Sequence, residues 1–432
     1  MTQTLLVAPG ETLHGVITVP GDKSISHRSL LFGALAEGET VIEGFLASED
    51  TRATVGCLRD MGVRIEEGER VVVHGVGLHG LRTPSKMLWT GNSGTTTRLL
   101  MGVLAGQPFA ATLEGDASLS RRPMDRVAIP LRMMGAQVRG QGERDTPPVT
   151  VHGGNLHAIH YTSPVASAQV KSAILLAGLY ADGVTTVTEP QKSRDHTERM
   201  LRGFGVEVEE DGLTVSLRGG QTLHGQSVIV PGDISSAAFF LIAGAIAPGA
   251  EITVCNVGIN PTRSGIIDVL QAMGANMQIA NERLAGGEPV ADITVRFGQL
   301  KATEIGGDLI PRLIDELPVL TVAAAFAEGT TVIRDARELR VKESDRIATV
   351  SRFLRDMGTE VEEREDGMVI HGGHTLHGTD VESHGDHRVA MSAAVAALAA
   401  GVVVRIHEAE TIATSFPNYT MLMRQLGARI EE

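Results

Sequence analysis

Two segments half a chain apart share one pattern. Residues 12–24 read TLHGVITVPGDKS, and residues 222–235 read TLHGQSVIVPGDIS. Self-similarity of this kind indicates a repeated structural unit, so the two halves of the 432-residue chain are predicted to be diverged copies of one domain design. The copies differ at Lys23, which corresponds to Ile234. A position at which only one copy carries a charge is a candidate for chemistry.

Each half divides again into three smaller repeats. Six strings, spaced roughly 70 residues apart, share the end of an amphipathic helix, a glycine and alternating strand residues. They are LRDMGVRIEE (58–67), LRMMGAQV (131–138), LRGFGVEVEE (201–210), LQAMGANMQI (270–279), LRDMGTEVEE (354–363) and MRQLGARIEE (423–432).

Two kinds of helix alternate within these repeats. One is Ala/Leu-rich and apolar nearly all round, which predicts that it is buried. The other is half polar, as with Ile347, Val350, Leu354 and Met357 at helical spacing, which predicts an outer position. With strands between the helices, the chain is predicted to form two similar α/β domains of three repeats each. The predicted ranges are 20–232 for the first domain, and 1–19 plus 233–432 for the second.

A Leu-His-Gly string recurs in the repeats and is interpreted as a short strand. It occurs at 13–15, 78–80, 223–225 and 376–378, with weaker forms at 156–158 and 300–302. Because metal ligands must cluster in space and these histidines belong to different repeats, no metal site is predicted. The two cysteines, Cys57 and Cys255, are interpreted as buried reduced thiols.

The composition argues against two classes of partner. A net charge of −14 and an aromatic content of 3% do not favour binding to nucleic acid or to an anionic membrane. The first residues lack the pattern of a signal peptide, and the Ala-rich helices are too short to span a bilayer. We therefore expect a cytoplasmic protein, and the charged outer helices favour a monomer.

Basic residues recur where the predicted helices begin. A cation at a helix N-terminus opposes the helix dipole, so its repeated placement there indicates bound anions. Because these residues come from both halves, the predicted site lies between the domains and holds several anionic groups. The basic residues are Lys23, Arg28, Arg122, Arg194, Lys342, Arg346 and Arg388.

Two carboxylates interrupt this basic set. Asp315 precedes an apolar helix, and Glu343 lies between Lys342 and Arg346. Acids held among cations are candidates for proton transfer. The alternative is structural: Asp315 could be an N-cap, and Glu343 a capping or ion-pair residue.

Nine ordered motifs closely resemble the 5-enolpyruvylshikimate-3-phosphate (EPSP) synthase family over essentially the whole chain. They are PGDKSISHR, GNSGTTTR, SRRPMDR, SAQVKSA, SRDHTE, LPVL after Asp315, RVKESDR, GDHRVAM and TSFPNY. The forms GDKS, SAQVK and RDHTE are similar to the second sequence class of the family, which includes enzymes that tolerate the herbicide glyphosate.

The resemblance implies a fold of two inside-out α/β domains built from six βαβαββ units. It also implies transfer of the enolpyruvyl group of phosphoenolpyruvate to shikimate 3-phosphate by addition and elimination, without a metal or cofactor, in the shikimate pathway to aromatic amino acids. Glyphosate is the expected inhibitor. Thr414 is one departure, since many members have Lys there; Arg388 or another neighbour would have to compensate.

The resemblance assigns roles to individual positions. Phosphoenolpyruvate would be bound by Lys23, Gly94, Arg122, Gln169, Arg346 and Arg388. Shikimate 3-phosphate would be bound by Lys23, Ser24, Arg28, Ser167, Gln169, Arg194, Asp315 and Lys342. Asp315 would take the proton of the 5-hydroxyl group, and Glu343 with Lys23 would handle the proton at the enolpyruvyl methylene.

Two other functions are weighed against this one. UDP-N-acetylglucosamine enolpyruvyl transferases share the fold and the donor, but they carry a reactive Cys in the loop that here reads DASLSRRP without Cys (116–123). A non-catalytic phosphate-binding scaffold would not need Asp315 and Glu343 among the cations.

Overall fold

The computed structural model describes residues 3–432, and the chain forms two compact units. Unit 1 holds the described residues up to Pro20 with Pro231–Leu284 and Glu288–Glu432. Unit 2 holds Gly21–Val230 and Ala285–Gly287. Each unit has its own hydrophobic core. None of the helices in the described chain is long and apolar enough to cross a membrane.

Each unit contains three four-stranded mixed sheets of one topology. In one of them, β11 (His160–Thr162) runs parallel to β12 (Val184–Thr188), which pairs antiparallel with β14 (Thr214–Arg218), and β14 pairs antiparallel with β13 (Val208–Asp211). The same order recurs in the other sheets, which are β16-β4-β6-β5 and β7-β8-β10-β9 in unit 2, and β2-β17-β19-β18, β20-β21-β23-β22 and β24-β25-β1-β26 in unit 1. The predicted α/β fold of six βαβαββ repeats is confirmed.

The two near-identical segments of the sequence exchange sheets. Strand β2 (His14–Thr18) precedes the first buried helix in the chain, yet it pairs with β17 (Glu251–Gly258) in unit 1. Strand β16 (Ser227–Ile229) precedes the fourth buried helix, yet it pairs with β4 (Glu39–Glu43) in unit 2. Each unit is therefore completed by a strand from the opposite half of the sequence.

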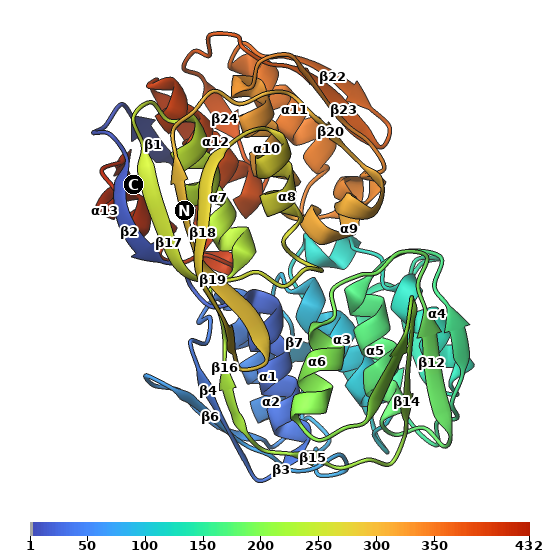
Figure 1. Ribbon diagram of the computed structural model, residues 1–432. Coiled ribbons are helices and arrows are strands. Elements are labelled where there is room, and N and C mark those ends of the chain that lie inside the picture. The colour runs from blue at the N-terminus through green and yellow to red at the C-terminus, as the bar shows by residue number, and fades with distance from the viewer. Residues whose placement is uncertain (1–2) are drawn as a thin grey trace. The chain divides into compact units, whose positions relative to one another are not determined.

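The six apolar helices lie inside the units, as predicted (Figure 1). All thirteen residues of α7 (Ile234–Ile246) are buried. Small residues let these helices approach closely: a Cβ atom on Gly102 would lie 2.3 Å from the carbonyl oxygen of Ala173 on the neighbouring helix. The others are α1 (Lys23–Leu35), α3 (Gly94–Ala105), α5 (Ala168–Gly178), α10 (Leu317–Phe326) and α12 (His387–Ala400).

The six amphipathic helices bury only one face. On α11 (Arg346–Asp356), Ile347, Val350 and Leu354 are buried, which confirms the prediction for this helix. The others are α2 (Glu49–Asp60), α4 (Asp125–Met133), α6 (His196–Gly203), α8 (Gly265–Ala272) and α13 (Tyr419–Gln425).

The strand interpretation of the Leu-His-Gly string is wrong for most of its copies. Residues 78–80 form a turn, residues 376–378 lie outside any strand, and His157 and Lys301 form only isolated bridges. In three of these connections the leucine is buried, at Leu156, Leu300 and Leu376. The glycine of the 376–378 copy passes close to other backbone: a Cβ atom on Gly378 would lie 2.2 Å from the carbonyl oxygen of Val403. The repeated pattern therefore reflects packing.

The two cysteines differ from each other. Cys57 is buried, and burial raises the pKa of its thiol to about 12. Cys255 is only partly buried, so the interpretation of both thiols as buried is wrong for this one.

Candidate active site

The buried helices of unit 2 each begin after a capping residue. The side chains of Asp22, Ser93 and Ser167 accept hydrogen bonds from backbone N–H groups of α1, α3 and α5, at 2.9, 3.1 and 3.4 Å. Capping fixes where each helix starts, and hence where the first-turn side chains lie. The predicted binding residues Lys23, Gly94 and Gln169 belong to these first turns.

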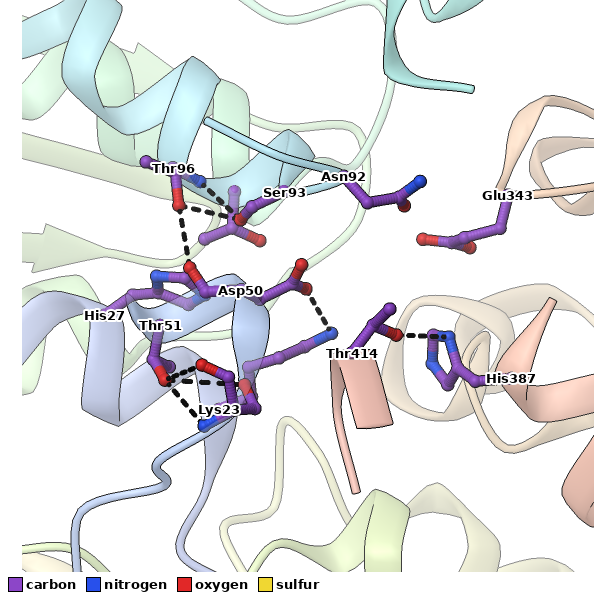
Figure 2. A network of polar contacts seen from close by, with 12 residues as sticks. Lys23, His27, Asp50, Thr51, Asn92, Ser93, Thr96, Glu343, His387 and Thr414 are labelled. Atoms are coloured by element: carbon purple, nitrogen blue, oxygen red, sulfur yellow. Dashed lines mark hydrogen bonds and ion pairs between the residues drawn. The ribbon is translucent and has the colours of Figure 1, made fainter. Parts of the chain in front are cut away.

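Lys23 is the first residue of α1, and Ser24 follows it. The Lys23 ammonium lies 3.0 Å from a carboxylate oxygen of Asp50 in the first turn of α2 (Figure 2). Both side chains are partly exposed, at 19% and 11%. Asp50 thus fixes the position of the ammonium, although no sequence pattern distinguishes this residue from other acids near helix starts.

Arg28 lies one turn further along α1 and is 3% exposed. Its guanidinium donates hydrogen bonds to the Ser24 carbonyl at 3.0 Å, to Ser172 Oγ at 2.7 Å and to Thr197 Oγ1 at 2.7 Å. These contacts connect α1 to α5 and α6, so the orientation of Arg28 depends on all three helices.

Arg122 is held against the loop that precedes α3. It donates to the Asn92 side chain at 2.5 Å, to the Asn92 carbonyl at 3.2 Å and to Ser118 Oγ at 3.3 Å. Gly94 is the first residue of α3, directly after this loop. A Cβ atom there would lie 2.8 Å from Arg98 Nη1, so the Arg98 guanidinium would have to shift, whereas Arg122 Nη1 at 3.6 Å is in ordinary contact distance.

Gln169 connects the starts of α5 and α3. Its amide oxygen accepts a hydrogen bond from Arg98 at 2.7 Å, and its amide nitrogen donates to Thr95 Oγ1 at 2.9 Å. Arg98 also donates to the Pro123 carbonyl at 3.1 Å. The sequence-based selection of site residues missed Arg98, although it ends the GNSGTTTR motif and repeats the pattern of a cation near a helix start.

Arg194 is half-buried in the loop before α6. This loop follows β12, and its neighbour Ser193 is buried, with its hydroxyl donating to Glu189 at 2.6 Å. This hydrogen bond therefore holds the loop in place at the residue before Arg194.

His27 lies on α1, four residues after Lys23, and is fully buried. Its Nδ1 is 2.8 Å from Thr54 Oγ1, which is 2.7 Å from Thr96 Oγ1. Thr96 in turn donates a hydrogen bond to Ser93 (Figure 2). Burial, followed by the charges of Lys23 and Arg28, lowers the pKa of His27 well below its usual range. A neutral imidazole therefore ties α1 to α2 and α3.

This lowered pKa predicts a loss of stability in acid. The unfolded imidazole binds a proton below a pH of about 6.5, whereas the folded one does not. The contribution of His27 is therefore complete above that pH and is lost, at about 1.4 kcal/mol per pH unit, as the pH falls towards the folded pKa. Between about pH 6.5 and about pH 5.5, the unfolding free energy in urea should fall by about 1 kcal/mol more for the natural protein than for His27→Asn. Equal losses would contradict this explanation.

In unit 1, Asp315 lies just before α10. The helix begins at Leu317 with Glu316 as its N-cap, so the structural alternative, in which Asp315 caps the helix, is wrong. An Asp315 carboxylate oxygen lies 3.6 Å from Lys342 Nζ and 3.5 Å from Arg346 Nη1. Two cations thus flank the carboxylate, and its side chain remains 17% exposed.

Arg388 reaches the same segment. It is the second residue of α12, and it donates a hydrogen bond to the Asp315 carbonyl at 2.8 Å. The backbone and the carboxylate of Asp315 are therefore both held by basic side chains.

Arg346 lies among the carboxylates of this part of unit 1 and is 1% exposed. It pairs with Asp386 at 2.8 Å and with Glu343 at 2.5 Å, in addition to Asp315. Burial alone would lower the pKa of Arg346, but the three carboxylates raise it above its usual range. Burial likewise opposes ionisation of Asp386, but Arg346 holds the pKa of this carboxyl below its usual value. The pair is therefore fully charged.

Glu343 and Thr414 are two further partly exposed residues of unit 1. Glu343 precedes α11 and forms the ion pair that its structural interpretation predicted, while its side chain stays 19% exposed. Thr414 Oγ1 lies 3.4 Å from His387 Nδ1 (Figure 2). Where many relatives have a lysine, this chain therefore has a short side chain directed at a histidine.

The structure thus divides the predicted residues into two sets, one in each unit. Across residues 3–432, no three or more His, Cys, Asp or Glu side chains lie close enough to hold a metal ion. The group in unit 2 comprises Lys23, Ser24, Arg28, Gly94, Arg122, Ser167, Gln169 and Arg194, and the group in unit 1 comprises Asp315, Lys342, Glu343, Arg346 and Arg388. We refer to the group in unit 2 as the basic half-site. We refer to the group in unit 1, which contains both basic and acidic residues, as the mixed half-site.

Known proteins match this chain over almost its entire length. The family model described as EPSP synthase (3-phosphoshikimate 1-carboxyvinyltransferase) matches residues 7–423. A 3-phosphoshikimate 1-carboxyvinyltransferase from Geobacillus kaustophilus (strain HTA426) is 58% identical, covering 96% of this chain and 98% of its own length. One from Desulforamulus reducens is 55% identical, covering 98% of this chain and 99% of its own.

Solved structures agree with this. An EPSP synthase from Acinetobacter baumannii superposes with a TM-score of 0.88 at 50% identity, and the match covers all of both chains. The enolpyruvyl transferase NikO from Streptomyces tendae has a TM-score of 0.79 at 18% identity, which supports the fold alone. From the full-length family match and the close relatives, the chain belongs to the EPSP synthase family, the 3-phosphoshikimate 1-carboxyvinyltransferases.

Proposed function

We propose that the basic and mixed half-sites act on the same pair of substrates, phosphoenolpyruvate and shikimate 3-phosphate. The 5-hydroxyl oxygen of shikimate 3-phosphate bonds to C2 of phosphoenolpyruvate, while C3 takes up a proton and becomes a methyl group. The bond from C2 to the phosphate oxygen then breaks, and the methyl group loses a proton. The products are 5-enolpyruvylshikimate 3-phosphate and inorganic phosphate.

Charge supports the binding roles. Both substrates carry a phosphate and a carboxylate, and helix N-termini with Lys and Arg bind such groups. We assign phosphoenolpyruvate to Lys23, Gly94, Arg122, Gln169, Arg346 and Arg388. We assign shikimate 3-phosphate to Lys23, Ser24, Arg28, Ser167, Gln169, Arg194, Asp315 and Lys342.

One observation carries the chemical assignment. The Asp315 carboxylate lies between Lys342 and Arg346, is partly exposed and caps no helix. A general base must be held in place and be able to reach the proton that it removes, and a partly exposed carboxylate between two side chains meets both conditions. We therefore assign to Asp315 the removal of the 5-hydroxyl proton. Glu343 and Lys23 are assigned to the proton at the methylene carbon.

Phosphate release tests this function. The purified protein should release phosphate only when phosphoenolpyruvate and shikimate 3-phosphate are both present. Release with UDP-N-acetylglucosamine in place of shikimate 3-phosphate would favour the rival transferase, which the absence of Cys from residues 116–123 argues against. No release with either acceptor, despite binding of the substrates, would favour a non-catalytic scaffold.

We propose that glyphosate competes with phosphoenolpyruvate. Replacement of Gly94 is then expected to change the binding of the inhibitor. A methyl group at this position lies 2.8 Å from Arg98 Nη1, so the guanidinium must shift. Glyphosate is slightly longer than the substrate, so the methyl group should penalise it more. Gly94→Ala should raise the inhibition constant of glyphosate at least about tenfold more than the KM for phosphoenolpyruvate, which is about 1.4 kcal/mol. Equal losses would show that the methyl group damages the pocket without discriminating.

Two further properties stay proposals. Both cysteines are free thiols, which supports a reducing compartment such as the cytoplasm. The charged faces of the outer helices support a monomer.

A further inference from the structure

A buried cluster of three charged side chains lies behind the basic half-site. Lys171 Nζ is 2.8 Å from Glu189 Oε2 and 2.7 Å from Glu198 Oε1. The exposed fractions of these side chains are 2%, 3% and 0%. We name these three residues the lysine cluster.

The cluster joins three elements of unit 2. Lys171 lies on buried helix α5, Glu189 directly follows strand β12, and Glu198 lies in the first turn of outer helix α6. An apolar side chain in place of each would be the ordinary solution for a domain core, because buried ion pairs are costly to desolvate. A charged cluster at this junction therefore calls for a reason beyond packing.

The charge states of the cluster are set by opposing effects. Burial alone would lower the pKa of Lys171, but Glu198 and Glu189 raise it above its usual range. Burial raises the pKa of Glu198, and the nearby ammonium does not fully offset this. The ammonium is thus held as a cation between the two acidic side chains.

Two residues of the cluster are next in the chain to the residues that hold Arg28. Ser172 and Thr197 are the two hydroxyl residues that accept hydrogen bonds from the Arg28 guanidinium. Ser172 is the neighbour of Lys171 in the chain, Thr197 is the neighbour of Glu198, and the two hydroxyl groups are 2.6 Å apart. The ion pair between Lys171 and Glu198 therefore fixes the spacing of the two groups that orient Arg28.

The cluster also holds the loop of Arg194. The second oxygen of Glu189 accepts a hydrogen bond from Ser193 Oγ at 2.6 Å, and Glu189 Oε2 accepts one from the Ser193 backbone N–H at 3.4 Å. Arg194 is the next residue. Lys171 therefore helps to position Arg194, the second cation of the basic half-site, through Glu189 and Ser193.

We infer that Lys171, Glu189 and Glu198 are positioning residues for shikimate 3-phosphate, acting through Arg28 and Arg194. The inference rests on the proposed function, in which these two arginines bind that substrate. The basic groups assigned to phosphoenolpyruvate have other supports: Lys23 pairs with Asp50, and Arg122 with Asn92. Loss of the cluster should therefore affect one substrate more than the other.

Kinetics of three variants test the inference. Lys171→Met should raise the KM and the dissociation constant for shikimate 3-phosphate at least about tenfold, which corresponds to about 1.4 kcal/mol, with a much smaller change in the KM for phosphoenolpyruvate. Ser193→Ala removes the hydroxyl contact between the loop and Glu189 but keeps the backbone one, and it should raise the same constants about threefold. Leu176→Ala is the control, because it creates a cavity in the same buried helix, five positions after Lys171, and removes no charged group.

The outcomes separate structural from positioning roles. A structural role predicts that Lys171→Met and Leu176→Ala lower thermal stability while leaving the ratio of the two KM values unchanged, and this result would overturn the inference. If Lys171→Met does not fold, Ser193→Ala decides alone, and an unchanged ratio in that variant overturns the inference. Natural protein that releases no phosphate would instead contradict the proposed function, while its binding of shikimate 3-phosphate could still be compared with that of the variants.

Discussion

Replacing Asp315 with Asn should lower kcat about a hundredfold or more, while the dissociation constant of shikimate 3-phosphate changes little. Asn has nearly the same shape as Asp, but its amide cannot accept the hydroxyl proton. Arg346 keeps Glu343 and Asp386 as partners in this variant, so the half-site should stay folded. Steady-state kinetics and calorimetric titration with shikimate 3-phosphate measure the two quantities.

Asp308→Asn is the matched control for this variant. Asp308 is an exposed carboxylate in the same connection, seven positions earlier in the chain, and its replacement should leave kcat unchanged. Full activity of Asp315→Asn would remove the proposed base from the mechanism. An equal loss of kcat in both variants would attribute the effect to a general change of charge.

Replacing Arg346 with Met should destabilise unit 1 by about 3–5 kcal/mol, because breaking a buried ion pair leaves its partner unpaired in the core. That partner is Asp386, whose side chain is 0% exposed and caps α12. Activity should also be lost, since Arg346 is assigned to phosphoenolpyruvate and flanks Asp315. Urea unfolding and phosphate release provide the two readouts.

Two further variants serve as controls for Arg346→Met. Arg364→Met breaks an exposed ion pair with Glu362 and should change the free energy of unfolding by no more than about 1 kcal/mol. Arg346→Lys keeps the charge but loses the planar fork, so it should fall between the natural protein and Arg346→Met. If Arg346→Met were as stable as Arg364→Met, the central role of this ion-pair group would be wrong.

The sequence predicted the elements of the fold well because their signals are local. A helix that is apolar all round, such as α7, has no side suited to water, and its burial follows directly. The ranges predicted from the sequence place β2 with the second domain and β16 with the first, but they do not show which strand each one pairs with. The two segments carry nearly the same residues, so neither pattern identifies β17 as the partner of β2 or β4 as the partner of β16.

The site residues show the same division between local and spatial signals. Cations beside helix starts were visible in the sequence, whereas the partners of these cations were not. Asp50, Asp386 and Lys171 are selected only by what lies next to them in space. The start of α10 is an intermediate case: Pro318 at the beginning of the helix could have placed the first turn after Asp315.

The central claim is that this chain transfers the enolpyruvyl group by addition and elimination. The most direct test is the reaction of phosphoenolpyruvate with shikimate 3-phosphate in D₂O, followed by mass spectrometry and NMR of the product. Protonation of C3 in the addition step predicts deuterium in the enolpyruvyl methylene group of 5-enolpyruvylshikimate 3-phosphate, formed together with one phosphate per product. A product that carries no deuterium at this carbon would contradict the account.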